Sequence, residues 1–346
     1  MTSKERVSAA MHYKKPDRVP VQYFYTPAGY YEHGGKLNDL YSRLPGDFQP
    51  FERFDPPILP ASDFDSEGKY HSFKRDSWGV LWEFRIFGVA GIPCDYPLAD
   101  ETKIESYKAP PAPPVPGNIA GARKAALAGR TDTYYRLAGC GSLFERMIEL
   151  RPEADVLCDL INGEPWIHRL ADIILEHDLA LVKAAAASGA DGVAFGDDYG
   201  TERGLIMSPA LWRSFFFPRL REIFRPALDA GMDIHFHSCG YIRDLLPYFA
   251  ELGITSIWPQ LPAYNMEELA KECRKLGLAL AVHTDRARTM TSGSPAEVRE
   301  LVLREYETFG LENGGGWFYI EADNGFPYAN IEALVETVKE LRGGRC

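Results

Sequence analysis

The chain has 346 residues, of which 45% are hydrophobic, so it can bury a large core in one α/β domain or in two smaller ones. Acidic residues outnumber basic ones by 49 to 38, and this balance leaves no basic surplus to neutralise a nucleic-acid backbone. Because no run approaches about 20 apolar residues and no export signal opens the chain, we expect a soluble cytoplasmic protein with no membrane contact.

The first part of the chain combines one helix–strand pair with a long irregular region. The residues from 2 to 11 have the pattern of a short helix, the prolines of 15–20 (KPDRVP) end it, and 21–25 reads as a strand. Residues 26–116 are rich in proline, glycine and aromatic residues and show little periodicity, so we expect an irregular segment that covers the rest of the fold. The final stretch of this region, 109–116 (APPAPPVP), predicts a rigid extended connector.

From residue 131 onward, apolar strands alternate with helical stretches. This alternation predicts parallel strands joined by right-handed helical crossovers. Seven strands are recognisable, which favours a single (β/α)₈ barrel domain over 1–346 with one strand unassigned. No glycine-rich nucleotide motif follows a strand, which disfavours a dinucleotide or nucleoside-triphosphate enzyme. The expected strands after 21–25 are 134–139, 191–196, 233–238, 254–258, 278–283 and 316–321, and the expected helices are 142–150, 153–188, 208–230, 241–252, 265–276, 294–310 and 330–342.

Polar and reactive side chains follow the ends of these strands. In a barrel of this kind the carboxyl ends of the strands and the following loops form the active face. We therefore expect these side chains to meet at one mouth: Asp197, Asp198, His237, Cys239, Gln260, His283, Asp285, Glu321 and Asp323.

The strand at 233–238 carries the most informative pattern, His-x-His-x-Cys. Alternation places His235, His237 and Cys239 on one face of the strand. At a rise of about 3.3 Å per residue, His235 and Cys239 start roughly 13 Å apart, whereas positions two apart can converge on one ion. We therefore predict that His237 and Cys239 bind a catalytic zinc ion and that His235 lies deeper, in a supporting role. The alternative is a core histidine beside a small buried thiol.

A catalytic zinc site needs a third protein ligand, which another strand must supply. Glu321 and Asp323 are the candidate carboxylates, and Glu321 is preferred because it ends an apolar run. The alternative for either residue is a loop carboxylate that binds backbone amides.

Three further sets of residues are candidates for catalysis and substrate binding. Asp197 and Asp198 could act as a general base, bind substrate or orient a zinc-bound histidine, or they could cap the following helix. His283 could donate a proton or act as a fourth ligand, or it could be a satisfied neutral side chain. The aromatic residues around Tyr25 and Tyr30, with Gln260, could line a substrate pocket, although aromatic residues in a long loop also pack against one another.

Several motifs resemble the uroporphyrinogen decarboxylase superfamily over nearly the whole chain. They are 4–7 (KERV), 15–20 (KPDRVP), 195–200 (FGDDYG), 236–247 (FHSCGYIRDLLP) and 293–299 (GSPAEVR). The resemblance implies a (β/α)₈ barrel, in agreement with the strand count. Within the superfamily, His237-x-Cys239 is similar to the branch of corrinoid-dependent methyltransferases, which bind zinc through His-x-Cys and a distant third residue.

Two departures from the family pattern narrow the expected function. Residues 25–31 (YTPAGYY) lack the arginines with which uroporphyrinogen decarboxylases hold their polycarboxylate substrate, so that substrate is not expected. Residues 321–325 (EADNG) stand where thiol-methylating members have Gly-Cys-Gly, which makes the Glu321 carboxylate the substitute ligand. The resemblance thus implies a zinc-dependent methyltransferase that exchanges a methyl group between a small substrate and the cobalamin of a separate corrinoid protein. A methoxylated aromatic substrate is favoured.

Two alternatives use the same barrel. One is a metal-independent decarboxylase of a small carboxylated substrate, with Asp197 or Asp198 guiding protons. The other is a barrel that binds a small ligand without catalysis.

Overall fold

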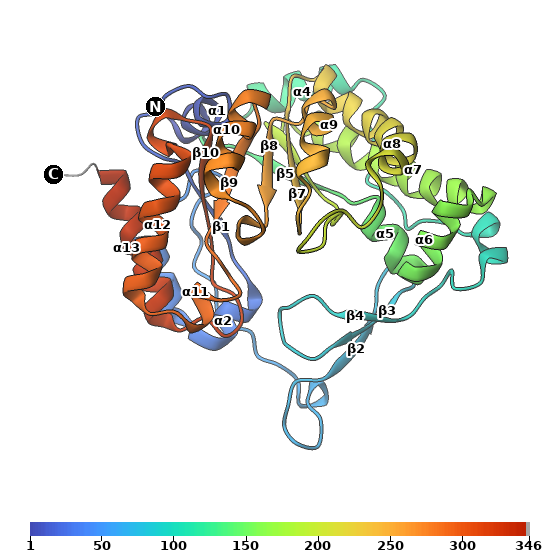
Figure 1. The fold of residues 1–346 in the computed structure, drawn as a ribbon, viewed down its shortest axis with the longest axis horizontal. Coiled ribbons are helices and arrows are strands. Elements are labelled where there is room, and N and C mark those ends of the chain that lie inside the picture. Colours follow the sequence, from blue (N-terminus) through green and yellow to red (C-terminus); the bar gives the residue numbers. More distant parts are fainter. Residues whose placement is uncertain (344–346) are drawn as a thin grey trace.

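Seven parallel strands form the curled sheet at the centre of the molecule (Figure 1). The structure is a computed structural model and describes residues 1–343; the cysteine at 346 lies outside the described residues. The strands lie in the order β1-β10-β9-β8-β7-β6-β5 and are parallel throughout, which confirms the predicted barrel class. They are β1 (Val21–Phe24), β5 (Leu137–Gly141), β6 (Gly192–Gly196), β7 (Asp233–Ser238), β8 (Ser256–Pro259), β9 (Ala279–His283) and β10 (Gly316–Glu321).

The unassigned eighth strand corresponds to a bend around Asp47 rather than to a strand of the described chain. The backbone N–H of Asp47 donates to the carbonyl of Val21 at 2.8 Å, and the N–H of Tyr135 donates to the carbonyl of Asp47 at 3.0 Å. Asp47 therefore links the first strand to the segment that leads into β5. Its carboxylate also binds Arg6 and Arg342, each at 2.7 Å, so this bend is fixed by two buried ion pairs.

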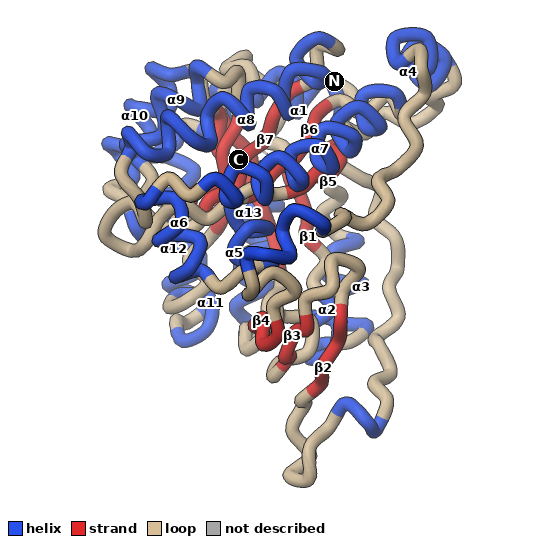
Figure 2. Tube along the Cα trace, turned by 90° about the vertical axis from the view of Figure 1, so that its right-hand side faces the viewer, coloured by secondary structure: helices blue, strands red, loops and turns tan. Residues whose placement is uncertain are grey.

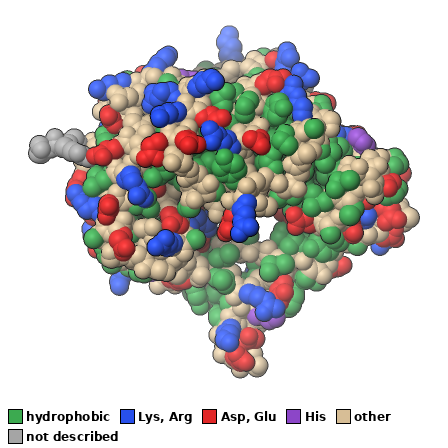
Figure 3. Space-filling view, in the orientation of Figure 1, with side chains coloured by type: hydrophobic (Ala, Val, Ile, Leu, Met, Phe, Trp, Pro, Cys, Tyr) green, Lys and Arg blue, Asp and Glu red, His purple; other side chains and the backbone are tan. Residues whose placement is uncertain are grey.

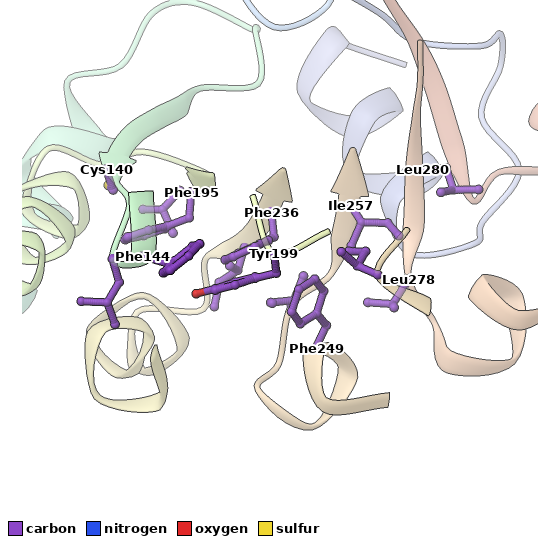
Figure 4. Packing of buried hydrophobic residues seen from close by; sticks show 14 of the residues in the cluster. Cys140, Phe144, Phe195, Tyr199, Phe236, Phe249, Ile257, Leu278 and Leu280 are labelled. Atoms are coloured by element: carbon purple, nitrogen blue, oxygen red, sulfur yellow. The ribbon is translucent and has the colours of Figure 1, made fainter. Parts of the chain in front are cut away.

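Helices cover the outside of the sheet and bury a continuous apolar core. Within this core, the Tyr199 ring lies between the rings of Phe144 and Phe236 (Figure 4). The predicted helical stretch 153–188 is divided in two, because Gly163 adopts φ 69° and ends the first helix. The helices after β5 are α5 (Phe144–Leu150), α6 (Glu153–Asn162), α7 (Pro165–Ala187), α8 (Pro209–Asp229), α9 (Leu246–Glu251), α10 (Met266–Leu276), α11 (Thr289–Ser292), α12 (Pro295–Phe309) and α13 (Tyr328–Gly343).

A second apolar cluster fills the interior of the barrel at its amino-terminal end. Helix α1 (Ser3–Met11) contributes Val7 and Met11, which pack with Trp317 and Tyr135. The helix is held there by a hydrogen bond from the N–H of Gly315 to the carbonyl of Ala10. This end of the barrel is therefore closed, and the opposite end is the accessible one.

The region 26–116 is more regular than its composition predicts. It forms α2 (Pro27–His33), α3 (Gly35–Ser42) and a three-stranded antiparallel sheet of β2 (Ser72–Arg75), β3 (Leu81–Phe84) and β4 (Ile92–Asp95). These elements are only four to eight residues long, too short for a periodic signal in the sequence. Residues 56–97, which we call the arm, project from the carboxyl end of the barrel (Figure 1).

A further helix, α4 (Ile119–Ala128), follows the proline-rich connector and packs on α7, at the opposite end of the molecule from β2, β3 and β4 (Figure 2). No helix of the described chain is long and apolar enough to cross a bilayer.

Candidate metal centre

Three potential metal ligands converge at the carboxyl ends of β6 and β7. The ligand atoms of Asp198, His237 and Cys239 all lie within 4.8 Å of one another. His237 Nε2 lies 3.3 Å from Cys239 Sγ and 3.6 Å from Asp198 Oδ1. The predicted His237–Cys239 pair is thus brought together, and Asp198 joins it.

The surroundings of His237 leave its Nε2 atom, which faces Cys239 and Asp198, free to bind a metal. Its Nδ1 lies 2.8 Å from the carbonyl oxygen of Trp258, which can only accept a hydrogen bond, so Nδ1 carries the proton and Nε2 presents its lone pair. Burial lowers the pKa of His237, which keeps the imidazole neutral at pH 7. The ring also packs on the indole of Trp258, with centroids 4.1 Å apart. Both contacts fix the direction of Nε2.

The loop that carries Cys239 is held by tight backbone packing. The N–H of Cys239 donates to Asp198 Oδ1 at 2.7 Å, and the N–H of Gly240 donates to Gln260 Oε1 at 2.9 Å. Gly240 has φ 74°, and a Cβ placed on it would lie 2.2 Å from the carbonyl carbon of Gly200. The two loops that carry Asp198 and Cys239 therefore touch through glycine backbone.

The donor set fits a zinc ion. Zinc bound to an imidazole nitrogen and a thiolate in a tetrahedral site places these atoms about 3.5 Å apart, close to the observed 3.3 Å. Burial, with the Asp198 carboxylate, raises the pKa of Cys239 to about 12, so the thiol is protonated unless a cation lies beside it. A neutral imidazole, a half-buried thiol and a carboxylate that forms no ion pair with lysine or arginine of the described chain suit a divalent ion.

Asp197 has a different environment from Asp198. Its carboxylate is fully buried and accepts hydrogen bonds from the N–H groups of Leu143 and Glu145 and from the Tyr199 hydroxyl, at 2.8 to 3.0 Å. These contacts hold the start of α5 against β6, and burial raises the pKa of Asp197 to about 7. The geometry thus gives Asp197 a supporting role, and its catalytic role stays a prediction.

Glu145 is a site residue that the sequence analysis missed. It lies in the first turn of α5, where burial and the carboxylates of Asp197 and Asp198 raise its pKa to about 9. An acidic residue in the first turn of a helix that follows a strand is common, so the sequence offers no signal that separates it from an ordinary surface glutamate.

Glu321 belongs to an ion-pair network beside the centre. Its Oε1 lies 2.8 Å from Arg286 Nε and 3.2 Å from His283 Nε2, and Arg286 also pairs with Asp323. The structure therefore groups Glu321 with His283 and Arg286, whereas Asp198 completes the cluster around His237 and Cys239. Sequence reasoning missed Arg286, which lies in the loop after β9 and has no motif around it.

A cavity of about 360 Å³ lies next to this network, at the mouth of the barrel. Gln260, His283 and Arg286 line it, together with Glu202 and Asp285. The Asp285 carboxylate also accepts hydrogen bonds from the backbone N–H groups at the start of α11. It therefore acts at least in part as a loop carboxylate that binds backbone amides.

The two tyrosines expected to bind substrate pack with other aromatic residues. Tyr30 is buried against Phe54, with centroids 4.8 Å apart, and Tyr25 contacts Tyr23 and Tyr41. Their role as substrate contacts stays a prediction. His235 lies deeper in the barrel, as expected, where its Nδ1 lies 3.0 Å from the Ser256 hydroxyl.

The fold of this chain is shared with known proteins. A search of curated protein sequences finds no match to this chain. Among solved structures, a methyltransferase from Methanosarcina mazei is 15% identical and superimposes with a TM-score of 0.65 over 98% of this chain and 99% of that one. Dihydropteroate synthase from Xanthomonas albilineans is more remote, with 11% identity and a TM-score of 0.37 over 57% of this chain and 64% of that one. The family model for uroporphyrinogen decarboxylase (URO-D) matches residues 124–341, which include every strand from β5 to β10, and the chain therefore belongs to the URO-D family.

Proposed function

We propose that this protein is a zinc-dependent methyltransferase that exchanges a methyl group between a small substrate and the cobalamin of a separate corrinoid protein. The observation that carries the proposal is the convergence of Asp198, His237 and Cys239 within 4.8 Å at the accessible end of the barrel. These three residues would hold the ion. The M. mazei methyltransferase has the same fold over nearly the whole chain, and at 15% identity this likeness supports the fold alone.

The favoured reaction is removal of the methyl group from a methoxylated aromatic compound. A zinc ion would act as a Lewis acid that polarises the ether oxygen. In the transfer, the bond between methyl carbon and oxygen breaks, its electrons stay on the aryl oxygen, and the methyl carbon bonds to cobalt with the electron pair of cobalt(I). The aryl oxygen then takes up a proton.

The residues beside the centre suit this chemistry. His283 lies on the wall of the cavity, next to Glu321, where it can return a proton to the leaving oxygen. Trp258 is half-buried next to His237 and offers apolar surface for an aromatic ring, and the buried Tyr319 ring stacks against it with centroids 4.3 Å apart. The Asp198 carboxylate at the mouth of the site and the absence of arginine in residues 25–31 both disfavour a polycarboxylate substrate.

The test measures zinc content and methyl transfer in the same preparations. Protein purified without added zinc is analysed for metal, and 2-methoxyphenol with free cob(I)alamin is the probe reaction, followed by the absorbance of methylcobalamin. We expect about one zinc per chain and measurable transfer. Cys239→Ser should lose both, whereas Cys158→Ser, which changes an exposed free cysteine on α6, should keep both.

The same measurements separate the alternatives. A protein that stays below about 0.2 zinc per chain after incubation with zinc would refute the proposal, because a zinc site whose ligands have folded into place binds tightly. Release of carbon dioxide from a carboxylated aromatic probe by the metal-free chain would favour a decarboxylase. Binding of the probe with no chemistry in the zinc-loaded chain would favour a ligand-binding barrel.

A further inference from the structure

Exposed apolar side chains gather at one end of the molecule. Monomeric proteins rarely expose contiguous apolar patches, and such patches commonly mark interaction sites. Seven of the twelve large hydrophobic side chains that are exposed in the described chain fall between residues 24 and 92, namely Phe24, Tyr31, Phe54, Ile58, Phe73, Ile86 and Ile92. Four of these seven, Ile58, Phe73, Ile86 and Ile92, belong to the arm.

Two apolar residues of the arm, Phe73 and Ile92, stand on one face of its sheet, on either side of Glu83, which pairs with His71 and Arg85. In the three-stranded sheet Phe73 lies opposite Glu83, and Glu83 lies opposite Ile92, so all three side chains stand on the same face. Phe73 is 54% exposed and Ile92 is 63% exposed, so this face has no covering layer within the described chain. Ile58, in the loop before β2, is 98% exposed.

The arm contacts the rest of the protein at two points, through Trp78 and through Gly88. At its base, Trp78 is buried between the Arg146 guanidinium, 4.8 Å from its ring centroid, and the ring of His177. At the turn between β3 and β4, a Cβ placed on Gly88 would lie 2.3 Å from the backbone nitrogen of Ala28 in α2, so this turn rests on that helix. The arm thus bridges two sides of the accessible end of the barrel.

The position of the arm at the accessible end of the barrel indicates which kind of protein would bind it. Helix α1 closes the opposite end of the barrel, so a cofactor that is carried by another protein must approach the candidate metal centre from the end where the arm projects. Figure 3 shows an opening between the arm and the barrel, with hydrophobic side chains on the arm beside it.

We propose that the exposed apolar side chains of the arm, Phe73 and Ile92 on its sheet and Ile58 in the loop before it, form the docking surface for the corrinoid-binding protein. The matching surface on that protein would be an apolar patch close to the edge of its corrinoid. This inference rests on the proposed function, since it assigns the place at which the protein partner of the methyl transfer binds.

The test compares two forms of the methyl acceptor. Free cob(I)alamin needs no docking surface, whereas a corrinoid-binding protein does. The protein probe is chosen from a panel of purified corrinoid-binding proteins as one that accepts methyl groups from the wild-type chain. The double variant Ile58→Glu/Ile92→Glu changes only exposed side chains, and Leu228→Glu, at the end of α8 and 39% exposed, is the control at the other end of the barrel.

We expect the double variant to raise the KM for the corrinoid-binding protein at least tenfold while its rate with free cob(I)alamin stays within twofold of wild type. The control should change neither value. An unchanged KM in the double variant would overturn the docking proposal, as would a wild-type chain that methylates free cobalamin but no protein of the panel. Absence of transfer to free cobalamin by the wild type would instead refute the proposed function. Self-association that the double variant abolishes, with an unchanged KM, would assign the surface to a second copy.

Discussion

The choice of the third zinc ligand can be tested by comparing Asp198→Asn with Glu321→Gln. Each substitution replaces a carboxylate by the amide of the same shape, so the change is one of charge and ligand strength. The Asp198 carboxylate lies 3.6 Å from His237 Nε2 and has no cationic partner within the described chain. Glu321 is already neutralised by Arg286, at 2.8 Å.

The expected magnitudes follow from these environments. Loss of a residue that only supports a metal ligand typically lowers metal affinity by 10- to 100-fold, so loss of a direct ligand should cost at least about 100-fold, or about 2.8 kcal/mol. We therefore expect Asp198→Asn to weaken zinc binding by about 100-fold or more. Glu321→Gln should change zinc binding by less than about threefold, because a zinc ion that recruited Glu321 would first have to break its pair with Arg286.

The assay is competition for zinc against a chromophoric chelator at pH 7.5, with circular dichroism to show that both variants are folded. The reverse outcome, in which Glu321→Gln loses zinc and Asp198→Asn keeps wild-type affinity, would refute the reasoning. It would mean that Glu321 leaves Arg286 when the metal binds and that the cluster of Asp198, His237 and Cys239 is not the ligand set.

Three further predictions concern stability. Asp197→Asn should lower the free energy of unfolding in urea by about 1 to 3 kcal/mol, because an amide nitrogen would face backbone N–H donors in a buried site. Gly240→Ala should cost more than about 1 kcal/mol and weaken zinc binding, because Gly240 has a positive φ and touches Gly200, whereas Gly204→Ala, which meets no atom within 4 Å, should be neutral. Burial raises the pKa of Glu305 to about 8, so the unfolded chain releases this proton at lower pH than the folded one and stability falls with rising pH from about 5 to 8. The variant Glu305→Gln should remove this contribution, roughly 1.4 kcal/mol per pH unit, and an identical pH profile in thermal unfolding of the two proteins would contradict it.

The barrel was predictable because its signal is repeated along the chain. Each buried strand is a short apolar run followed by a helix, and the predicted strands at 233–238 and 316–321 coincide with β7 and β10. The eighth position was not predictable, because Asp47 closes the sheet through single hydrogen bonds from a bend. The elements of the arm were missed for a related reason: each strand has four residues, and its partners are set by tertiary contacts rather than by a local pattern.

The site was predictable where its residues are neighbours in sequence. His237 and Cys239 are two positions apart at a strand end, so geometry alone brings them together. Glu321 was preferred as the third ligand because it ends an apolar strand, but that position says nothing about its partner. Arg286 comes from the loop after the adjacent strand, and the sequence gives no indication that its side chain turns back onto Glu321.

The pair Asp197 and Asp198 shows why residue type and position at a strand end are insufficient to assign a role. Successive side chains after a strand point to opposite sides, so one aspartate faces the helix layer while the other faces the barrel mouth. The Asp197 carboxylate accepts hydrogen bonds from the backbone at the start of α5 and from the Tyr199 hydroxyl, and these bonds fix the loop that follows β6. Asp198 then meets the backbone of Cys239 and the imidazole of His237. A shift of one residue in that loop would exchange the two carboxylates, so the buried hydrogen bonds of Asp197 are the condition that presents Asp198 to a metal.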